Sequence, residues 1–241
     1  MNGVSITLRT FGASLFSRGG MPRGVWVFLL VTLASIGAYF YGAFDRTQII
    51  DLGHWALFPG TPLLALALSG IPLVEPHTGK TLLYLTVAPV SRTTLAVVRT
   101  LATSILVGCT LAAIAIVANA VAEIWSVHSA RQIGAIILGS IFYTTLFGMI
   151  QIAFKKGLFA GVLFYFLLDV PLARLPAELS MLAPSWHLRV LAGPTFTSDV
   201  ARVGSFSAAP ENSAFFLIAG TLLCGLSTIV IFKRKDIGDL C

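Results

Sequence analysis

The chain has 241 residues, of which 56% are hydrophobic and only 11% are charged, and its mean hydropathy is +0.90. A soluble domain carries roughly 25% charged residues, so this composition excludes a soluble globular protein and predicts a polytopic membrane protein. The net charge of +6 does not indicate nucleic-acid binding. The basic residues fall in short clusters at the ends of apolar runs, where they set orientation in a membrane.

The three cysteines do not suggest a disulfide framework. Cys109 and Cys224 lie within apolar runs, where we expect them to pack as small hydrophobic side chains, and Cys241, the last residue, is expected to be free. No cleavable signal peptide is expected, because the first apolar run is long enough to span a membrane and be retained.

The N-terminal segment, residues 2–18, precedes the first long apolar run. Val4, Leu8, Phe11 and Leu15 fall on one stripe of a helix in this segment. The pattern predicts a helix that lies in the membrane interface. The alternative is a disordered tail.

Six apolar runs follow, and each is predicted to span the membrane, since about 20 apolar residues cross a hydrocarbon core of about 30 Å. They comprise residues 24–44, 55–74, 94–121, 132–154, 158–175 and 213–232. Pro59, Pro62 and Pro72 interrupt the second run, so we expect a kinked helix whose freed carbonyl groups are satisfied by neighbouring helices. The predicted fold is all-α, with six transmembrane helices in a single domain that covers residues 1–241.

The segment between the second and third runs, residues 75–93, is called the central loop and reads EPHTGKTLLYLTVAPVSRT. It carries a short apolar core between charged residues and closes with a turn signal at Pro89. We expect an amphipathic element at the membrane surface that a soluble partner can bind. The alternatives are an ordinary connecting loop and a phosphate-binding loop ending in Gly79-Lys80-Thr81. The phosphate-binding motif needs a glycine where this chain has Val74.

The longest loop, residues 176–212, lies between the fifth and sixth runs and is broken by four prolines. Within it, residues 179–191 are apolar and include Trp186, so we expect this part to enter the membrane interface. Six spans place both termini on one side. Because the N-terminal segment, the central loop, residues 155–156 and the C-terminus are the densest in Lys and Arg, that side is predicted to be cytoplasmic.

Candidate catalytic and metal-binding residues are few. His54, His77, His128 and His187 fall in loops or at the ends of runs, whereas a metal or haem site in a helical bundle needs histidines on facing helices. An intramembrane hydrolase needs a nucleophile and a base at membrane depth. We therefore expect no catalytic residues, no metal site and no cofactor, and we do not expect an enzyme.

Two charged residues lie well inside the apolar runs, Asp169 and Arg99. An ionisable residue within a membrane is a functional candidate. Both residues are close to the ends of their runs, however, so we expect their side chains to extend to the membrane surface. Gly157 and Gly161 are spaced so that two helices can approach closely at them.

These features together resemble the membrane subunit of type-two ABC exporters. In that family the loop after the second span begins with Glu, continues to a Gly/Thr pair and two leucines, and ends in Pro-x-Ser-Arg. The matching residues here are Glu75, Gly79, Thr81, Leu82, Leu83, Pro89, Ser91 and Arg92. The sequence departs from the pattern at Lys80, between the Gly and the Thr, and at Pro76-His77, in place of a charged pair.

The resemblance implies a permease dimer in the inner (cytoplasmic) membrane, paired with two cytoplasmic ABC ATPase subunits that bind the ATP and Mg²⁺. The central loop, including Leu85, would dock on the ATPase as a coupling helix, and Leu179, Leu182, Trp186 and Leu191 would help to close the outer exit. Membrane lipid is the other expected partner. The alternative functions are a secondary transporter, which would need a charge at mid-membrane depth, and a non-transporting anchor for a cytoplasmic complex.

Overall fold

The computed structural model of the chain describes residues 53–69, 92–121, 123, 127–154, 156–175, 179–193 and 209–234. Within these residues the fold is all-helical and contains no strand. Three of the described helices are long and apolar enough to cross a membrane, over Ala96–Val121, Ser129–Ala153 and Pro210–Ile231. The predicted N-terminal helix and first span lie outside the described residues. So do the end of the second span, residues 75–91 of the central loop, and Cys241.

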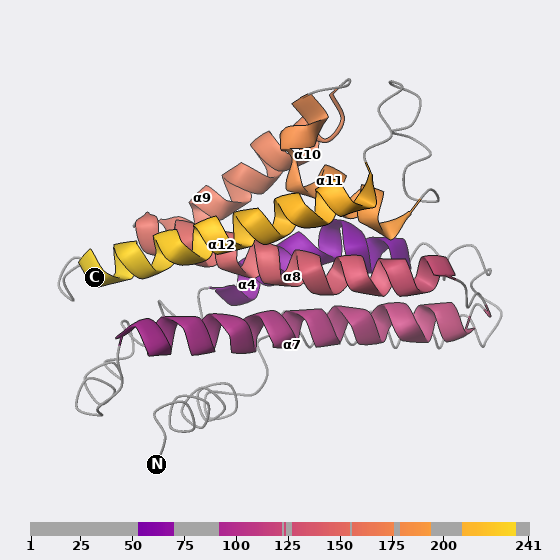
Figure 1. Ribbon diagram of the computed structural model, residues 1–241, viewed down its shortest axis with the longest axis horizontal. Coiled ribbons are helices and arrows are strands. Elements are labelled where there is room, and N and C mark those ends of the chain that lie inside the picture. The colour runs from indigo at the N-terminus through magenta and orange to yellow at the C-terminus, as the bar shows by residue number, and fades with distance from the viewer. Residues whose placement is uncertain are drawn as a thin grey trace, which may run out of the picture.

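The three long helices are α7 (Arg92–Val121), α8 (Val127–Ala153) and α12 (Pro210–Arg234). Helix α7 lies alongside α8 and runs in the opposite direction, while α12 packs on another side of α8 (Figure 1). Helix α8 is the centre of the bundle: 67% of its membrane-crossing stretch is buried, against 11% for α12. Most of α12 therefore faces the surroundings of the chain.

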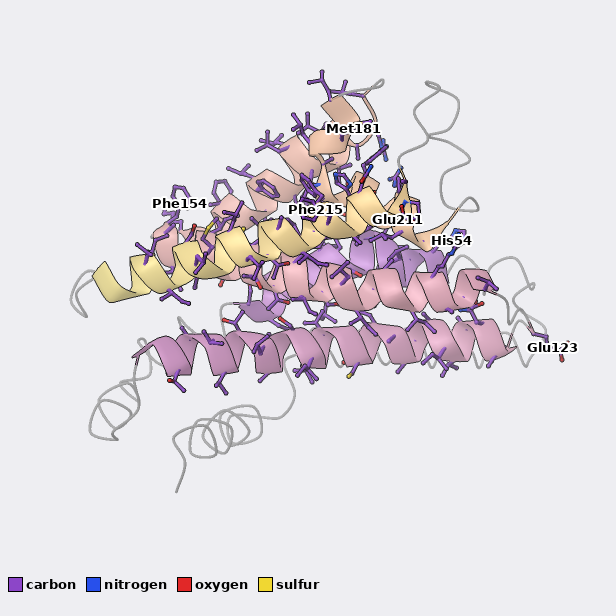
Figure 2. The ribbon with its side chains drawn as sticks, viewed as in Figure 1. His54, Glu123, Phe154, Met181, Glu211 and Phe215 are labelled. Carbon is purple, nitrogen blue, oxygen red and sulfur yellow. The ribbon has the colours of Figure 1, made fainter. Side chains whose placement is uncertain are left out.

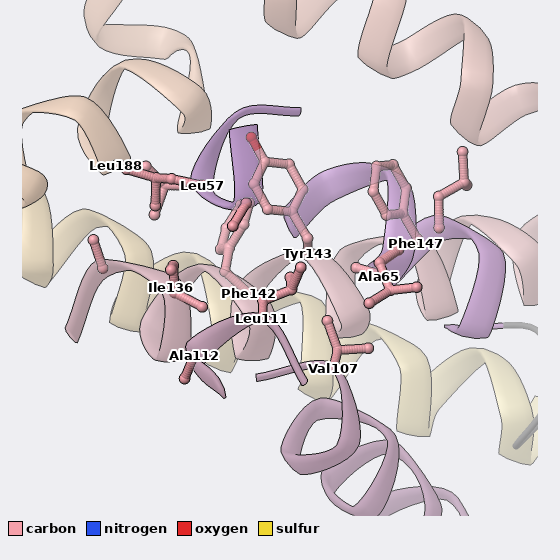
Figure 3. Close-up of a cluster of buried hydrophobic side chains, with 14 of the residues drawn as sticks. Leu57, Ala65, Val107, Leu111, Ala112, Ile136, Phe142, Tyr143, Phe147 and Leu188 are labelled. Carbon is pink, nitrogen blue, oxygen red and sulfur yellow. The ribbon is translucent and has the colours of Figure 1, made fainter. Parts of the chain in front are cut away.

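The central position of α8 follows from its side chains. Three of its side chains are fully buried: Ile136, Tyr143 and Phe147. Neighbouring members of this set are seven and four residues apart, and residues at these spacings lie on the same side of a helix. The rings of Tyr143 and Phe147 stack with centroids 5.6 Å apart (Figure 3). Leu111 of α7 and Leu188 belong to the same buried cluster, so one apolar core joins segments far apart in the sequence.

The second predicted span is broken, as its prolines predict. Its described part contains a π-helical turn, η1 (Ala56–Gly60), and helix α4 (Thr61–Ser69). Phe58 has extended backbone angles (φ −136°, ψ 117°), which a following proline favours, because its ring disfavours the helical region for the residue before it. The predicted kink is therefore confirmed at Pro59.

Side chains of the same segment and of α8 bond several carbonyls of this segment. The Thr61 hydroxyl donates to the Ala56 carbonyl across it (3.1 Å). From α8, the Gln132 side-chain amide donates to the carbonyl of Gly53 (2.7 Å), and the Gln151 amide donates to the carbonyl of Leu66 (3.0 Å). Both ends of the broken helix are thus bound to the same neighbour.

The fifth apolar run forms one helical stretch of three parts: α9 (Gly157–Leu163), the π-helical turn η2 (Phe164–Asp169) and α10 (Val170–Leu172). Close approach at its glycines is confirmed. A Cβ atom at Gly161 would lie 2.4 Å from Leu66 Cδ1, and one at Gly157 would lie 2.2 Å from Gln151 Cα. At Gly157 the near atoms are backbone, so only glycine allows the start of α9 to pack this closely on the end of α8; at Gly161 the near atom is the end of the Leu66 side chain, which can shift.

Two short helices lie in the loop before α12: η3 (Leu179–Leu182) and α11 (Pro184–Ala192). Helix α11 packs on both α8 and α12. The remainder of the loop, residues 176–178 and 194–208, lies outside the described residues.

Candidate functional site

The residues proposed to couple to an ATPase lie almost entirely outside the described part of the chain. They are Glu75, Gly79, Thr81, Leu82, Leu83, Leu85, Pro89 and Ser91. Arg92 is the first residue of α7. The coupling role of the central loop stays a prediction.

The four residues proposed for the outer gate are placed on the two short helices but do not form one surface. Leu179 and Leu182 of η3 are exposed, at 53% and 62%. Trp186 is buried against Ala173, just beyond α10, whereas Leu191 packs against the main core. The structure therefore divides this set into two exposed leucines and two residues that attach α11 to the bundle.

Asp169 is the clearest correction to the sequence-based expectations. Its side chain does not extend to the membrane surface but is buried, with 1% of its area exposed. The carboxylate accepts hydrogen bonds from the Tyr143 hydroxyl (2.5 Å) and from the backbone N–H of Ser185 (3.0 Å). An ionised carboxylate is stable inside a protein only when such donors replace its water.

These three residues join three elements, so we call Tyr143, Asp169 and Ser185 the Asp169 cluster. Tyr143 comes from the centre of α8, Asp169 from the end of η2, and Ser185 from the first turn of α11. Arg189, one turn further along α11, lies close enough for its positive charge to act on Asp169. Its guanidinium carbon is also 5.2 Å from the centre of the Phe58 ring. The hydrogen bonds from Tyr143 and Ser185 are thus the contacts that compensate the buried Asp169 side chain.

His187 forms a second polar contact between α11 and its neighbours. Its Nε2 lies 2.8 Å from the Met181 carbonyl and its Nδ1 lies 3.1 Å from the Ser213 hydroxyl. A carbonyl only accepts, so Nε2 carries the proton and Nδ1 accepts from Ser213. The ring stacks on Phe216 of α12, with centroids 4.0 Å apart, and burial lowers the pKa of His187. The imidazole therefore connects η3, α11 and α12.

Sequence reasoning missed both contacts for the same reason. Asp169 and Tyr143 are 26 residues apart, as are His187 and Ser213, and no periodicity in a single sequence pairs such positions. The one signal in the sequence was the charge of Asp169 inside an apolar run, which indicates a functional or structural role for that residue. Because Asp169 lies near the end of the run, we expected its side chain to extend to the membrane surface, and this expectation was wrong.

The chemistry of the Asp169 cluster is that of a hydrogen-bonded attachment. Within the residues that the structure describes, no group of three His, Cys, Asp or Glu side chains is placed to hold a metal ion. Comparisons with family models, with curated proteins and with solved structures find no match to the chain.

Proposed function

We propose that the chain is the transmembrane subunit of an ATP-driven ABC exporter, which forms the substrate pathway as a dimer and is driven through the central loop by cytoplasmic ATPase subunits. The observation that carries this proposal is the order of the described elements. A proline-broken helix precedes the central loop, α7, α8 and the α9–α10 stretch follow it, and two short helices separate that stretch from α12. The resemblance of the sequence implies the same order.

The direction of the helices also supports the proposal. Figure 1 shows the C-terminal end of α4, the start of α7, the start of α9 and the end of α12 at one end of the bundle. Phe154 lies near this end, whereas His54, Glu123 and Glu211 lie toward the other (Figure 2). The chain positions of Arg92, Lys156 and Arg234 therefore share the first end. Clustered basic residues at one end favour a cytoplasmic location for it, and the end of α4 and the start of α7, which flank the central loop in the sequence, are both at that end.

The surface of α12 is consistent with a lipid or subunit contact. Four large apolar residues, Phe215, Leu222, Leu223 and Leu226, are 61–72% exposed. A soluble protein rarely exposes a continuous apolar face of this kind. In the proposed assembly such faces contact lipid or the second permease subunit.

A secondary transporter is the second candidate, and one observation favours it: Asp169 is a buried carboxylate within an apolar helix. A proton-coupled carrier needs such a group near mid-membrane depth. Asp169 bonds Tyr143, in the middle of α8, and the backbone N–H of Ser185 in α11, so both of its carboxylate oxygens are engaged by groups of the chain itself. These bonds suit an attachment between helices better than a transport site.

Purification of the tagged full chain in mild detergent tests the proposal. We expect an ATPase subunit to co-purify with the chain. ATP hydrolysis should be present only in the fractions that contain that subunit, and the native mass should correspond to a complex with two copies of the permease. A single copy that transports without any ATPase would instead establish a secondary transporter.

A further inference from the structure

The start of α11 lacks a capping side chain of its own. Its N-cap position is Ala183, which makes no side-chain hydrogen bond, and Pro184 at the next position has no N–H to donate. Ser185 therefore carries the first free N–H of this helix. The first N–H groups of a helix need acceptors from outside it, and a negative charge is favoured there.

Asp169 supplies that acceptor from another helix. Its Oδ1 is 3.0 Å from the Ser185 nitrogen, and its Oδ2 is 2.5 Å from the Tyr143 hydroxyl. The Ser185 hydroxyl donates in turn to the backbone carbonyl oxygen of Asp169 (3.5 Å). Both carboxylate oxygens are thus used, one on α11 and one on α8.

We propose that the Asp169 cluster is a latch, which holds the first turn of α11 on the η2–α10 stretch and on α8 and sets how often this turn opens. The inference goes beyond the proposed exporter function, because it concerns how α11 is attached and does not depend on what the chain transports. In the exporter proposed above, the same latch would set the position of the outer short helices.

The other contacts of α11 explain why the latch acts selectively. His187 bonds Ser213 and stacks on Phe216, both in α12, and the Leu188 side chain is fully buried in the main core. Loss of the latch therefore leaves α11 attached to α12 and to the main core, while the first turn of α11 keeps only the packing of Trp186 against Ala173 as its contact with the fifth helical stretch. We expect the N-terminal half of α11 to open far more often, with the rest of the bundle unchanged.

Hydrogen–deuterium exchange of the purified full chain in lipid nanodiscs measures this opening. In Asp169→Ala we expect the amides of residues 185–192 to exchange roughly tenfold faster or more, since an N-terminal N–H and a buried hydroxyl lose their charged partner. The exchange rates of the α7 amides should stay within about twofold of those in the unmodified protein. None of the hydrogen bonds of the Asp169 cluster involves a residue of α7. Unchanged exchange over 185–192 would overturn the proposal, and so would an increase that is equal in α7 and α11.

Two further variants distinguish a latch from general packing. Asp169→Asn keeps an oxygen that accepts from Ser185, but its amide only donates and leaves the Tyr143 hydroxyl hydrogen without its acceptor, so an increase smaller than in Asp169→Ala is expected. Tyr143→Phe removes one bond and keeps the ring, so a smaller but still selective increase is expected. Thr145→Val is the matched control, because the Thr145 hydroxyl bonds only the Ile141 carbonyl of its own helix.

Tyr143→Phe also decides the matter where Asp169→Ala does not yield folded protein. In that case a selective increase over 185–192 relative to Thr145→Val supports the latch. The same exchange in the two variants overturns it.

Discussion

His187 lies where three elements meet, and its protonation state is fixed by its surroundings. The Met181 carbonyl accepts from Nε2, the Ser213 hydroxyl donates to Nδ1, and Phe216 covers the ring. Each of these contacts suits the neutral imidazole. Burial disfavours the charged form further, and in the charged form the Ser213 hydroxyl would have to turn and accept from Nδ1.

This arrangement predicts a loss of stability in acid. Burial lowers the pKa of His187 in the folded protein, below the usual value of about 6.5 that the unfolded chain retains. As the pH falls through that value the unfolded state binds a proton that the folded state does not, so the free energy of unfolding decreases; above it, the contribution of His187 is fully present. We expect the thermal midpoint in detergent to fall between about pH 7.5 and about pH 5.5.

His187→Gln is the comparison for this prediction, because glutamine does not titrate. We expect a lower midpoint than in the unmodified protein at the higher pH, since the stacked ring is lost, and a smaller decrease on acidification. An equal decrease in both proteins would assign the acid sensitivity to other groups.

At the scale of the elements, α8 organises the bundle through polar as well as apolar contacts. Gln132 and Gln151 bond carbonyls at the two ends of the broken helix that contains α4, and Gln132 also accepts from Asn119 of α7 (3.1 Å). Gln151 further donates to the Ser69 hydroxyl (2.8 Å). The helix that leads into the central loop is thereby fixed to α8 at both ends.

The spacing of these glutamines predicts independent effects on stability. They are separated by 151 − 132 = 19 residues, roughly 28 Å along α8. Gln132→Leu and Gln151→Leu should each destabilise the protein by about 0.6–2 kcal/mol, because a carbonyl inside the bundle loses its donor. The double variant should show the sum, within about 0.5 kcal/mol.

Unfolding in mixed detergent micelles measures these changes. Thr228→Val is the control, since the Thr228 hydroxyl bonds only the Cys224 carbonyl of its own helix. A double variant no less stable than either single variant would show that the two contacts do not act independently.

The elements themselves could be predicted well where apolar length decides them. The runs at residues 94–121 and 213–232 correspond to α7 and α12 within a few residues. The run at 132–154 misses the start of α8 at Val127, because the polar residues from Ser129 to Gln132 continue the helix without adding hydropathy. The π-helical turns and the partners of Asp169 could not be predicted, because they depend on contacts between distant segments.

Cys109 illustrates the same limit at a single position. It lies in an apolar run, as predicted, but is exposed on α7 and does not pack inside the chain. Cys224 is partly buried, which is closer to the expectation. Hydropathy identifies a residue as membrane-embedded, but it does not tell which side of a helix faces lipid.

At the scale of the whole molecule, orientation in the membrane is a prediction that the described positions make testable. Val127, at the start of α8, is 70% exposed, and Lys156, between α8 and α9, is exposed at the opposite end. With the three native cysteines replaced by serine, Val127→Cys should react with an impermeant thiol reagent in intact cells. Lys156→Cys should react only after permeabilisation, because the basic end is expected to be cytoplasmic.

The native Cys241 provides an independent check, since it follows the basic residues at 233–235. In the otherwise unmodified chain it should be labelled only after permeabilisation, and Cys241→Ser should abolish that signal. Labelling of Lys156→Cys or Cys241 from outside would reverse the assigned orientation and place the central loop away from any cytoplasmic ATPase.

The last prediction concerns the central loop, whose apolar core is Leu82, Leu83 and Leu85. Replacing all three leucines with serine removes apolar contact worth roughly 1.5–3 kcal/mol for each side chain that is fully buried on a partner. At about 1.4 kcal/mol per tenfold, three such losses weaken a docked interface by several orders of magnitude. Because the loop is expected outside the lipid, the triple variant should insert normally and yet lose ATPase co-purification and transport.

Arg92→Ala is the comparison for the triple variant, because a charge at the rim of an interface contributes less than its apolar centre. We expect weaker but detectable co-purification of the ATPase, with transport reduced rather than abolished. Membrane insertion, measured by the same cysteine labelling, must be unchanged in both variants for the comparison to report on docking. If the triple variant still binds the ATPase and transports at the original rate, the loop only connects two helices, and the force from ATP binding must reach the bundle by another route.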